Sequence, residues 1–403
     1  MNQTISSVQR PAAPSVQVPI RLLYITDAIF TGGDTRCEVW LLDALDKRRF
    51  AVTAFTSPQG PTAEQIGKIA GIRHVPTHFG VLEGARARGP MNKLRSLLLF
   101  SAALAKVAWV AWRTRPQAIF TGDRTRAMLA ALCAARISRR AALVFHPQFF
   151  FAPGFANGGL KRRTALRADL VITNSGFTNQ SYAQIGVVPE KLLMAYNAID
   201  ASRFSPGASP EARARLGIPE DALLIGIFSI LRPFKGHAVL LKAMPRVLEA
   251  VPNAHLLIVG SGELRPELEQ LTQDLGLQRH VTYTGFQRDT LPLYRALDLY
   301  AMPSVEEPFG LVTIEAMACE KAVVGADSGG TPEIVDDQET GLLVPTNQIE
   351  PLADAIITLL RDPERRQIMG QKGRQRVLEK FTLQGRSEQI AGALEHLVKT
   401  RNI

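Results

Sequence analysis

Two glutamates, Glu307 and Glu315, stand on either side of a Pro-Phe-Gly turn with seven residues between them. The turn leads into an apolar stretch typical of a helix, so the backbone N–H groups of Phe309, Gly310 and Leu311 are expected to lie unpaired at a helix N-terminus. Unpaired N–H groups of this kind bind a diphosphate or a sugar hydroxyl. Glu315, about one turn further along, can accept both hydroxyls of a ribose, while Glu307 faces the group carried on the phosphates. The segment predicts a binding site for a phosphorylated sugar or a nucleotide.

Cationic and glycine-rich segments support the same site. A pair of glutamates alone would carry little weight, because most helical glutamates are solvated surface residues. Arg232 and Lys235, however, follow an expected strand over residues 223–229, which puts two cations at a strand end where a diphosphate would lie. The Gly-Gly-Thr-Pro-Glu segment 329–333 opens another helix after a later strand. These features together favour an anionic ligand in the second half of the chain.

The elements that position these residues are read from the alternation of apolar strand-length runs with helical patterns, which is typical of parallel α/β sheets. The first set of expected strands covers residues 20–26, 51–56, 118–121, 142–145, 170–173 and 192–196. The second set covers residues 223–229, 256–259, 281–284, 299–301, 322–325 and 342–344. We predict an α/β protein with two doubly wound, Rossmann-like domains that face a central cleft.

Proline and glycine mark the boundary between the two domains, because Pro206, Gly207 and Pro210 interrupt the alternation. We expect a disordered tail over residues 1–19, an N-terminal domain over 20–200, a linker over 201–219 and a second domain over 220–380. The last helix, over residues 381–403, is expected to pack back on the N-terminal domain.

The sequence EPFGLVTIEAMA of residues 307–318 resembles the E-x7-E signature of the retaining glycosyltransferases of family 4, whose architecture is the two-domain GT-B fold. Lys235-Gly236 upstream and the GGTPEIV segment 329–335 downstream resemble further motifs of that family. The resemblance begins near residue 20 and is densest over residues 223–345. It implies that the second domain binds a nucleotide-diphosphate sugar and the N-terminal domain binds the acceptor.

The resemblance also implies roles for single residues. Glu315 would hold the ribose, Glu307 would contact the donor sugar, and Arg232 with Lys235 would neutralise the departing diphosphate. The implied catalytic residues are Glu307, Lys235, Arg232 and His146; the implied donor-binding residues are Glu315, Phe309, Gly310, Leu311, Gly32, Gly33, Gly285 and Phe286.

Five further positions, like Arg232 and Lys235, lie outside the signature itself. Gly32 and Gly33 would let a first-domain loop approach the phosphates closely. The nucleobase would lie near Gly285 and Phe286. His146, at a strand end, matches a family histidine beside the sugar, although a lone histidine there is equally typical of a structural hydrogen-bonding residue.

The implied activity is that of a hexosyltransferase of polysaccharide biosynthesis, which moves a sugar with retention to a glycan, lipid-linked or small-molecule acceptor. The chain has no D-x-D pair, so we expect no metal and no cofactor besides the donor. Two alternatives stay open: a nucleotide-sugar 2-epimerase of the same architecture, and an inactive nucleotide-sugar-binding homologue, for which the displaced Arg232 and Glu320 would be the signs. A nicotinamide-binding Rossmann enzyme is disfavoured, because Gly260-Ser261-Gly262 lacks the third glycine of that fingerprint.

Charge and cysteine content bear on partners and compartment. The net charge is +10, and residues 1–200 hold 25 Lys and Arg against 11 Asp and Glu, a surplus of 14. No nucleic-acid-binding module accompanies this charge, so we expect no nucleic-acid partner and consider peripheral contact of the basic half with a membrane surface. Three dispersed cysteines favour a reducing, cytoplasmic location, with the inner face of the membrane as its variant. The apolar segment 96–112 is expected to be a buried sheet-covering helix rather than an interfacial one.

Overall fold

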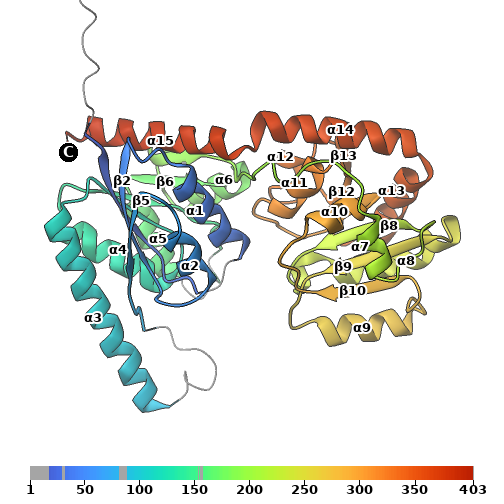
Figure 1. Ribbon diagram of the computed structural model, residues 1–403, viewed down its shortest axis with the longest axis horizontal. Coiled ribbons are helices and arrows are strands. Elements are labelled where there is room, and N and C mark those ends of the chain that lie inside the picture. Colours follow the sequence, from blue (N-terminus) through green and yellow to red (C-terminus); the bar gives the residue numbers. More distant parts are fainter. Residues whose placement is uncertain (1–17, 30–31, 81–88, 153, 155–157, 403) are drawn as a thin grey trace, which may run out of the picture.

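Two separate parallel sheets organise the chain. The computed structural model describes residues 18–402 apart from 30–31, 81–88, 153 and 155–157, so nearly all of the expected tail lies outside the described residues. The two sheet domains lie beside each other, and two long C-terminal helices run along one side of both (Figure 1). These helices are α14 (Pro363–Lys380) and α15 (Leu383–Thr400).

The N-terminal sheet has seven parallel strands in the order β3-β2-β1-β4-β5-β6-β7. Its strands are β1 (Ile20–Ile25), β2 (Phe50–Thr56), β3 (Ile72–Pro76), β4 (Ala118–Thr121), β5 (Ala142–Phe145), β6 (Leu170–Thr173) and β7 (Leu192–Met194). Its helices are α1 (Gly33–Ala44), α2 (Pro61–Gly67), α3 (Pro90–Thr114), α4 (Thr125–Ile137), α5 (Gly158–Arg167) and α6 (Gly176–Gln184). The central strands are continuous apolar runs because helices cover both faces of the sheet.

The second sheet has six parallel strands in the order β10-β9-β8-β11-β12-β13. Its strands are β8 (Leu223–Phe228), β9 (Ala254–Val259), β10 (Val281–Gly285), β11 (Leu299–Met302), β12 (Ala322–Ala326) and β13 (Gly341–Val344). Its helices are α7 (Pro210–Arg215), α8 (His237–Ala250), α9 (Arg265–Asp274), α10 (Leu291–Ala296), α11 (Leu311–Ala318), α12 (Thr331–Ile334) and α13 (Ile349–Arg361). The order reverses between β8 and β11, which creates the crevice where ligands bind in doubly wound sheets. The predicted fold class is confirmed.

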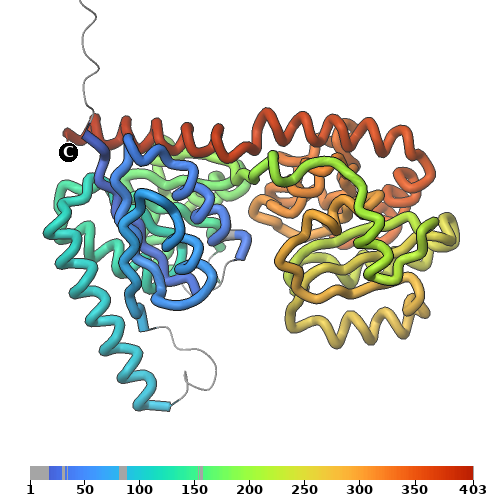
Figure 2. The backbone as a smooth tube through the Cα atoms, viewed as in Figure 1, coloured from blue at the N-terminus to red at the C-terminus, as the bar shows by residue number. Residues whose placement is uncertain are grey.

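The chain passes between the domains twice, after β7 and between α14 and α15, and the two crossings run side by side (Figure 2). They are joined where Ile199 and Thr382 form a parallel bridge and the Ile199 N–H donates to the Phe381 carbonyl at 3.0 Å. Paired crossings of this kind restrict how far one domain can move without the other.

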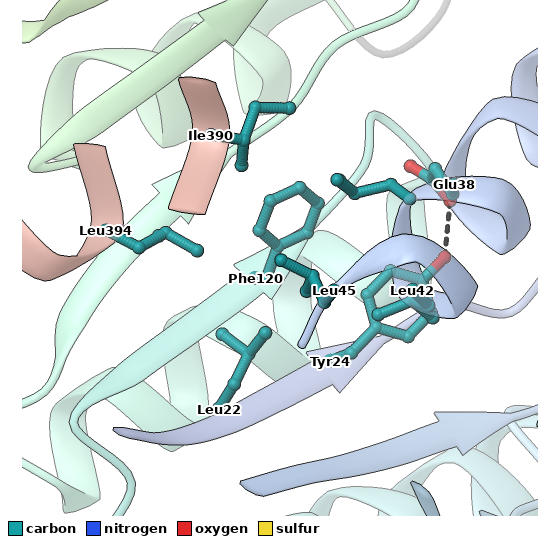
Figure 3. A pocket seen from close by; sticks show the side chains of 9 residues that line it. Leu22, Tyr24, Glu38, Leu42, Leu45, Phe120, Ile390 and Leu394 are labelled. Atoms are coloured by element: carbon teal, nitrogen blue, oxygen red, sulfur yellow. Dashed lines mark hydrogen bonds between the residues drawn. The ribbon is translucent and has the colours of Figure 1, made fainter. Parts of the chain in front are cut away.

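Helix α15 packs on the N-terminal domain against α1. Ile390 and Leu394 of α15 face Leu22 and Phe120 of the first sheet (Figure 3). Arg49 forms ion pairs with Glu388 and Glu395 at 2.7 Å each. The space between these apolar side chains holds not even a water molecule, so this region is packed core and not a ligand site.

The expectation that residues 96–112 form a buried helix is wrong. Helix α3 buries one narrow stripe, formed by Ala103, Val107, Val110 and Ala111, and leaves large apolar side chains in contact with solvent. It lies on the outer side of the N-terminal domain, away from the second domain (Figure 1). Apolar composition alone could not distinguish a helix covered on all sides from one covered on a single stripe.

Candidate active site

The turn between β11 and α11 forms the base of the candidate site. Gly310 caps α11 with a φ of 111°, a left-handed conformation that favours glycine, and so lets the chain turn directly into the helix. The N–H groups of Phe309, Gly310 and Leu311 donate no hydrogen bond to any described residue. These donors are therefore available to the oxygens of a ligand, as expected for a helix N-terminus.

Gly329 and Gly330 hold this turn in place. The Gly330 N–H donates to the Glu307 carbonyl at 2.7 Å. A Cβ on Gly329 would lie 2.4 Å from that same oxygen, and one on Gly330 would lie 2.6 Å from the Pro308 oxygen. Only glycine permits such close backbone packing, so the 329–333 motif fixes the position of Glu307.

Lys235 and Glu307 meet across the crevice between β8 and β11. Lys235 lies in a short 3-10 turn after β8, and its ammonium group forms an ion pair with the Glu307 carboxylate. Gly236, with a φ of 76°, lets this turn pack closely on the end of β11, because a Cβ at this position would lie 2.2 Å from the Pro303 oxygen. Arg232, three residues before Lys235, is exposed to solvent. The structure thus unites two predicted residues and leaves Arg232 open to a ligand.

Glu315 lies at the contact between the domains and is 1% exposed. One carboxylate oxygen pairs with the Arg36 guanidinium of α1, and the other accepts a hydrogen bond from the Tyr294 hydroxyl at 2.9 Å. Burial raises the pKa of the Glu315 carboxyl, and the charge of Arg36 opposes that shift. The first-domain turn also approaches here, since a Cβ on Gly33 would lie 3.3 Å from the Leu311 side chain.

Arg36 and Tyr294 were not among the residues predicted from sequence. Arg36 lies in the first turn of the helix that Gly33 begins, and the guanidinium also stacks 4.9 Å from the centre of the Trp40 ring. A cation three residues after the glycine pair was the available signal. Tyr294 belongs to α10 and gives no signal of its own in the sequence.

Gly285 is the last residue of the edge strand β10, and Phe286 follows it. Gly285 has a φ of 70°, and the Phe286 side chain is 73% exposed. An exposed aromatic ring at a strand end offers a stacking surface for a base. The assignment of the nucleobase to this position stays a prediction.

His146 is fully buried. Its Nε2 lies 2.9 Å from both an Arg386 guanidinium nitrogen and the Gln148 amide nitrogen. Burial and the nearby charge of Arg386 lower the pKa of His146 well below its usual value, so the ring is neutral. In this conformation the ring links α15 to the N-terminal domain and has no surface open to a sugar. Its predicted place beside the donor sugar stays a prediction.

Further contacts between the domains surround the site. The Glu333 carboxylate accepts hydrogen bonds from the N–H groups of Gly176 and Phe177 at 2.6 and 2.8 Å, at the N-terminus of α6. The Ser175 hydroxyl donates to the Pro308 carbonyl at 2.6 Å. The signature turn is therefore attached to the N-terminal domain as well as to its own. Within the described parts of the chain, no three His, Cys, Asp or Glu side chains form a group that could hold a metal ion.

Two family models match the chain, one in each domain. The model described as Glycosyltransferase Family 4 matches residues 32–203, and the model described as Glycosyl transferases group 1 matches residues 208–376. With two parallel-sheet domains joined by paired crossings, the fold is GT-B. The chain belongs to the family 4 glycosyltransferases.

Curated relatives resemble part of the chain. It is 34% identical over 250 residues to the GDP-mannose-dependent alpha-(1-6)-phosphatidylinositol monomannoside mannosyltransferase of Mycolicibacterium smegmatis, covering 58% of this chain and 65% of that protein. It is 33% identical over 227 residues to the D-inositol 3-phosphate glycosyltransferase of Saccharomonospora viridis, covering 53% of each chain. The matched segment thus spans less than two thirds of either relative.

Solved structures resemble nearly all of it. HepE of Anabaena, in complex with UDP and glucose, has a TM-score of 0.79 and 25% identity, covering 93% of this chain and 99% of that one. The sucrose-phosphate synthase of Thermosynechococcus elongatus, at 23% identity and a TM-score of 0.75 over 95% of this chain and 100% of that one, shows the same fold.

Proposed function

We propose that the protein transfers a hexose from a nucleotide-diphosphate sugar to an acceptor, with retention of the anomeric configuration. The observation that carries the proposal is the arrangement around the α11 N-terminus. Buried Glu315, the Glu307–Lys235 pair and three available N–H groups converge where the second sheet reverses its strand order. HepE was solved in complex with UDP and glucose, which supports a nucleotide sugar as the ligand.

In this proposal each group performs one step. Glu315 accepts the ribose hydroxyls, and the N–H groups of the 309–311 turn donate to the diphosphate. Lys235 and Arg232 stabilise the negative charge that develops on the diphosphate as the glycosidic bond breaks. Glu307, held by Lys235, contacts the sugar. The departing diphosphate oxygen takes the acceptor's proton on the same face, which accounts for retention without a side-chain nucleophile.

No metal ion and no cofactor take part in the proposed mechanism. Two cationic side chains and a helix N-terminus supply the positive charge that a divalent cation supplies in other nucleotide-sugar enzymes. The absence of a metal from the mechanism can be tested separately from the transfer activity, because it predicts that the activity persists when metal ions are chelated.

The acceptor in this proposal binds to the N-terminal domain and carries free hydroxyl groups. The relatives' names specify a phosphatidylinositol mannoside and an inositol phosphate, and both are polyols attached to phosphate. The surplus of 14 cations in residues 1–200 suits such an anionic acceptor, soluble or lipid-linked, on the cytoplasmic side of a membrane.

The test is transfer from a panel of UDP-, GDP- and ADP-hexoses to inositol phosphate and to lipid-linked polyols, measured by mass spectrometry of the products. The proposal expects free nucleotide diphosphate together with a glycosylated acceptor, and NMR of the product shows the donor's anomeric configuration. Release of nucleotide without a glycosylated acceptor would instead indicate an epimerase or hydrolase. Binding of nucleotide without any turnover would indicate an inactive homologue.

A further inference from the structure

Helix α3 carries most of the large hydrophobic side chains that are more than half exposed among the described residues. Eight large hydrophobic side chains there are more than half exposed, and six of them are on α3: Met91, Leu94, Leu97, Leu98, Trp109 and Trp112. Of the other two, Val18 lies before the first strand and Phe286 lies at the candidate nucleotide site. Soluble domains rarely leave so many apolar side chains on one element without a binding role.

The exposed side chains form a continuous stripe. Met91, Leu94 and Leu98 are spaced by three and four residues, Trp109 follows Leu98 by eleven residues, or about three turns, and Trp112 follows by three more. All five therefore lie on one side of the helix. The buried stripe of Ala103, Val107, Val110 and Ala111 faces α4 instead. Helix α3 therefore has two apolar stripes, one packed against α4 and the other exposed to solvent.

The helix is fixed to its domain on the inner side. The Ser96 hydroxyl donates to the Gly80 carbonyl at 2.6 Å, and an Arg126 guanidinium nitrogen donates to Ser96 at 2.7 Å. Lys106 donates to the Pro76 carbonyl at 2.9 Å. Helix α3 is long and apolar enough to cross a bilayer, and it is the one such helix among the described residues, but crossing would break all of these contacts and place Lys106 in hydrocarbon.

The charges along α3 are of one sign. The 25 residues of the helix hold four cations, Lys93, Arg95, Lys106 and Arg113, and no aspartate or glutamate, and Arg115 caps its end. Tryptophan prefers the boundary between water and lipid. The Arg113 guanidinium lies 5.5 Å from the centre of the Trp109 ring, and Trp112 precedes Arg113 in the chain. An apolar stripe whose charged neighbours on the helix are all cations, with tryptophan among its side chains, complements the surface of an anionic bilayer.

We propose that α3 is a lipid-binding surface, which lies in the interface of an anionic membrane and holds the enzyme on it through Met91, Leu94, Leu98, Trp109 and Trp112. The helix stays attached to α4, and the cations on its flanks contact lipid phosphates. The inference does not depend on the proposed catalytic activity, because nucleotide binding and membrane binding are measured separately.

The test uses the full chain with vesicles of phosphatidylcholine, with and without phosphatidylglycerol. We expect cosedimentation with the anionic vesicles, weakened by salt, and a blue shift of tryptophan emission as Trp109 and Trp112 enter the interface. The double variant Leu98→Glu/Trp112→Glu should lower the bound fraction at least tenfold. The matched control, Ile368→Glu/Leu378→Glu, introduces the same two charges at exposed apolar side chains of α14 and should bind like the wild type.

Several outcomes would overturn the inference. Wild-type protein that remains in the supernatant with both vesicle types would refute it, as would equal binding by the double variant and the control. Dimers in light scattering that Leu98→Glu/Trp112→Glu dissociates, without vesicle binding, would show that a second copy covers the stripe. Calorimetry with nucleotide diphosphate should give the same affinity for all variants, so a failure of the nucleotide site would be recognised as a separate result.

Discussion

Replacing Arg36 with alanine should strengthen the binding of the nucleotide diphosphate. In the structure the Arg36 guanidinium is paired with the Glu315 carboxylate, which we propose as the acceptor for the ribose hydroxyls, so the ligand has to displace the guanidinium. Arg36 comes from the N-terminal domain and Glu315 from the second, so each nucleotide that binds also breaks a contact between domains. Removing the arginine leaves Glu315 with the Tyr294 hydroxyl as its donor and the other carboxylate oxygen available to the ribose.

The magnitude follows from the burial of the pair. Glu315 is almost wholly enclosed, whereas 31% of the Arg36 side chain is exposed. A hydrogen bond between charged groups contributes about 1.5–3 kcal/mol, and the partial exposure of the Arg36 side chain reduces this to about 1–2 kcal/mol. Since every 1.4 kcal/mol is a factor of ten, the dissociation constant should fall by about five- to thirtyfold.

The assay is isothermal titration calorimetry with UDP, GDP and ADP, with folding checked by circular dichroism. Arg48→Ala is the matched control, because Arg48 is on the same domain, is 91% exposed and pairs with nearby Asp46. The control should bind like the wild type. Unchanged or weaker binding by Arg36→Ala would refute the idea that Arg36 competes with the ribose and would suggest a contact between Arg36 and the ligand.

Three further predictions concern charge and stability. Lys235→Ala should lower turnover at saturating donor by two to three orders of magnitude, since charge stabilisation of the departing diphosphate is worth about 3–4 kcal/mol. Arg232 is exposed and should contribute less, so Arg232→Ala should lower turnover about tenfold. An inactive Arg232→Ala beside a nearly normal Lys235→Ala would contradict this order. Activity should survive exhaustive treatment with EDTA, and loss that Mg²⁺ or Mn²⁺ restores would disprove the metal-free mechanism. Burial, with a smaller effect of nearby His280, lowers the pKa of His255 to about 4 in the folded protein, below the value of about 6.5 expected when unfolded. Between these pH values the unfolded chain therefore binds one more proton than the folded one, and the free energy of unfolding should increase as the pH is raised from about 4 to about 6.5. His255→Gln should remove up to about 3 kcal/mol of that rise in urea titrations, and an identical pH profile in the variant would show that the ring does not titrate this way.

The fold could be predicted to a large extent because helices bury both faces of each sheet. Twelve of the thirteen strands are apolar runs that the sequence marks directly. The missed strand, β3, is Ile-Arg-His-Val-Pro at the edge of the first sheet, where exposed polar side chains and a final proline are tolerated. Its identity is set by pairing with β2 and not by its own composition.

The site could be predicted only where it is local. Glu307, Gly310 and Glu315 lie in one segment, so their spacing reveals both the turn and the helix. Arg36 pairs with Glu315 across 279 positions, and only the packing of one domain on the other brings them together. The role of Gly262 also depends on a contact that the sequence does not reveal. A Cβ added at this position would lie 2.4 Å from the Leu231 oxygen, so the glycine allows the two backbone segments to pack closely and supports the loop that carries Arg232.

The central claim, that Glu315 binds the ribose of the donor, is tested most directly where Arg36 no longer competes. The measurement is the affinity of Arg36→Ala for nucleotide diphosphate, compared with that of Arg36→Ala/Glu315→Gln. Glutamine keeps an acceptor for the Tyr294 hydroxyl but loses the charge. The matched control Arg36→Ala/Glu306→Gln changes an exposed glutamate that precedes Glu307 in the chain. We predict that the Glu315 variant binds at least tenfold more weakly, because a charge-assisted hydrogen bond contributes about 1.5–3 kcal/mol, and that the control is unaffected. Equal affinities in all three proteins would contradict the account and place the ribose elsewhere.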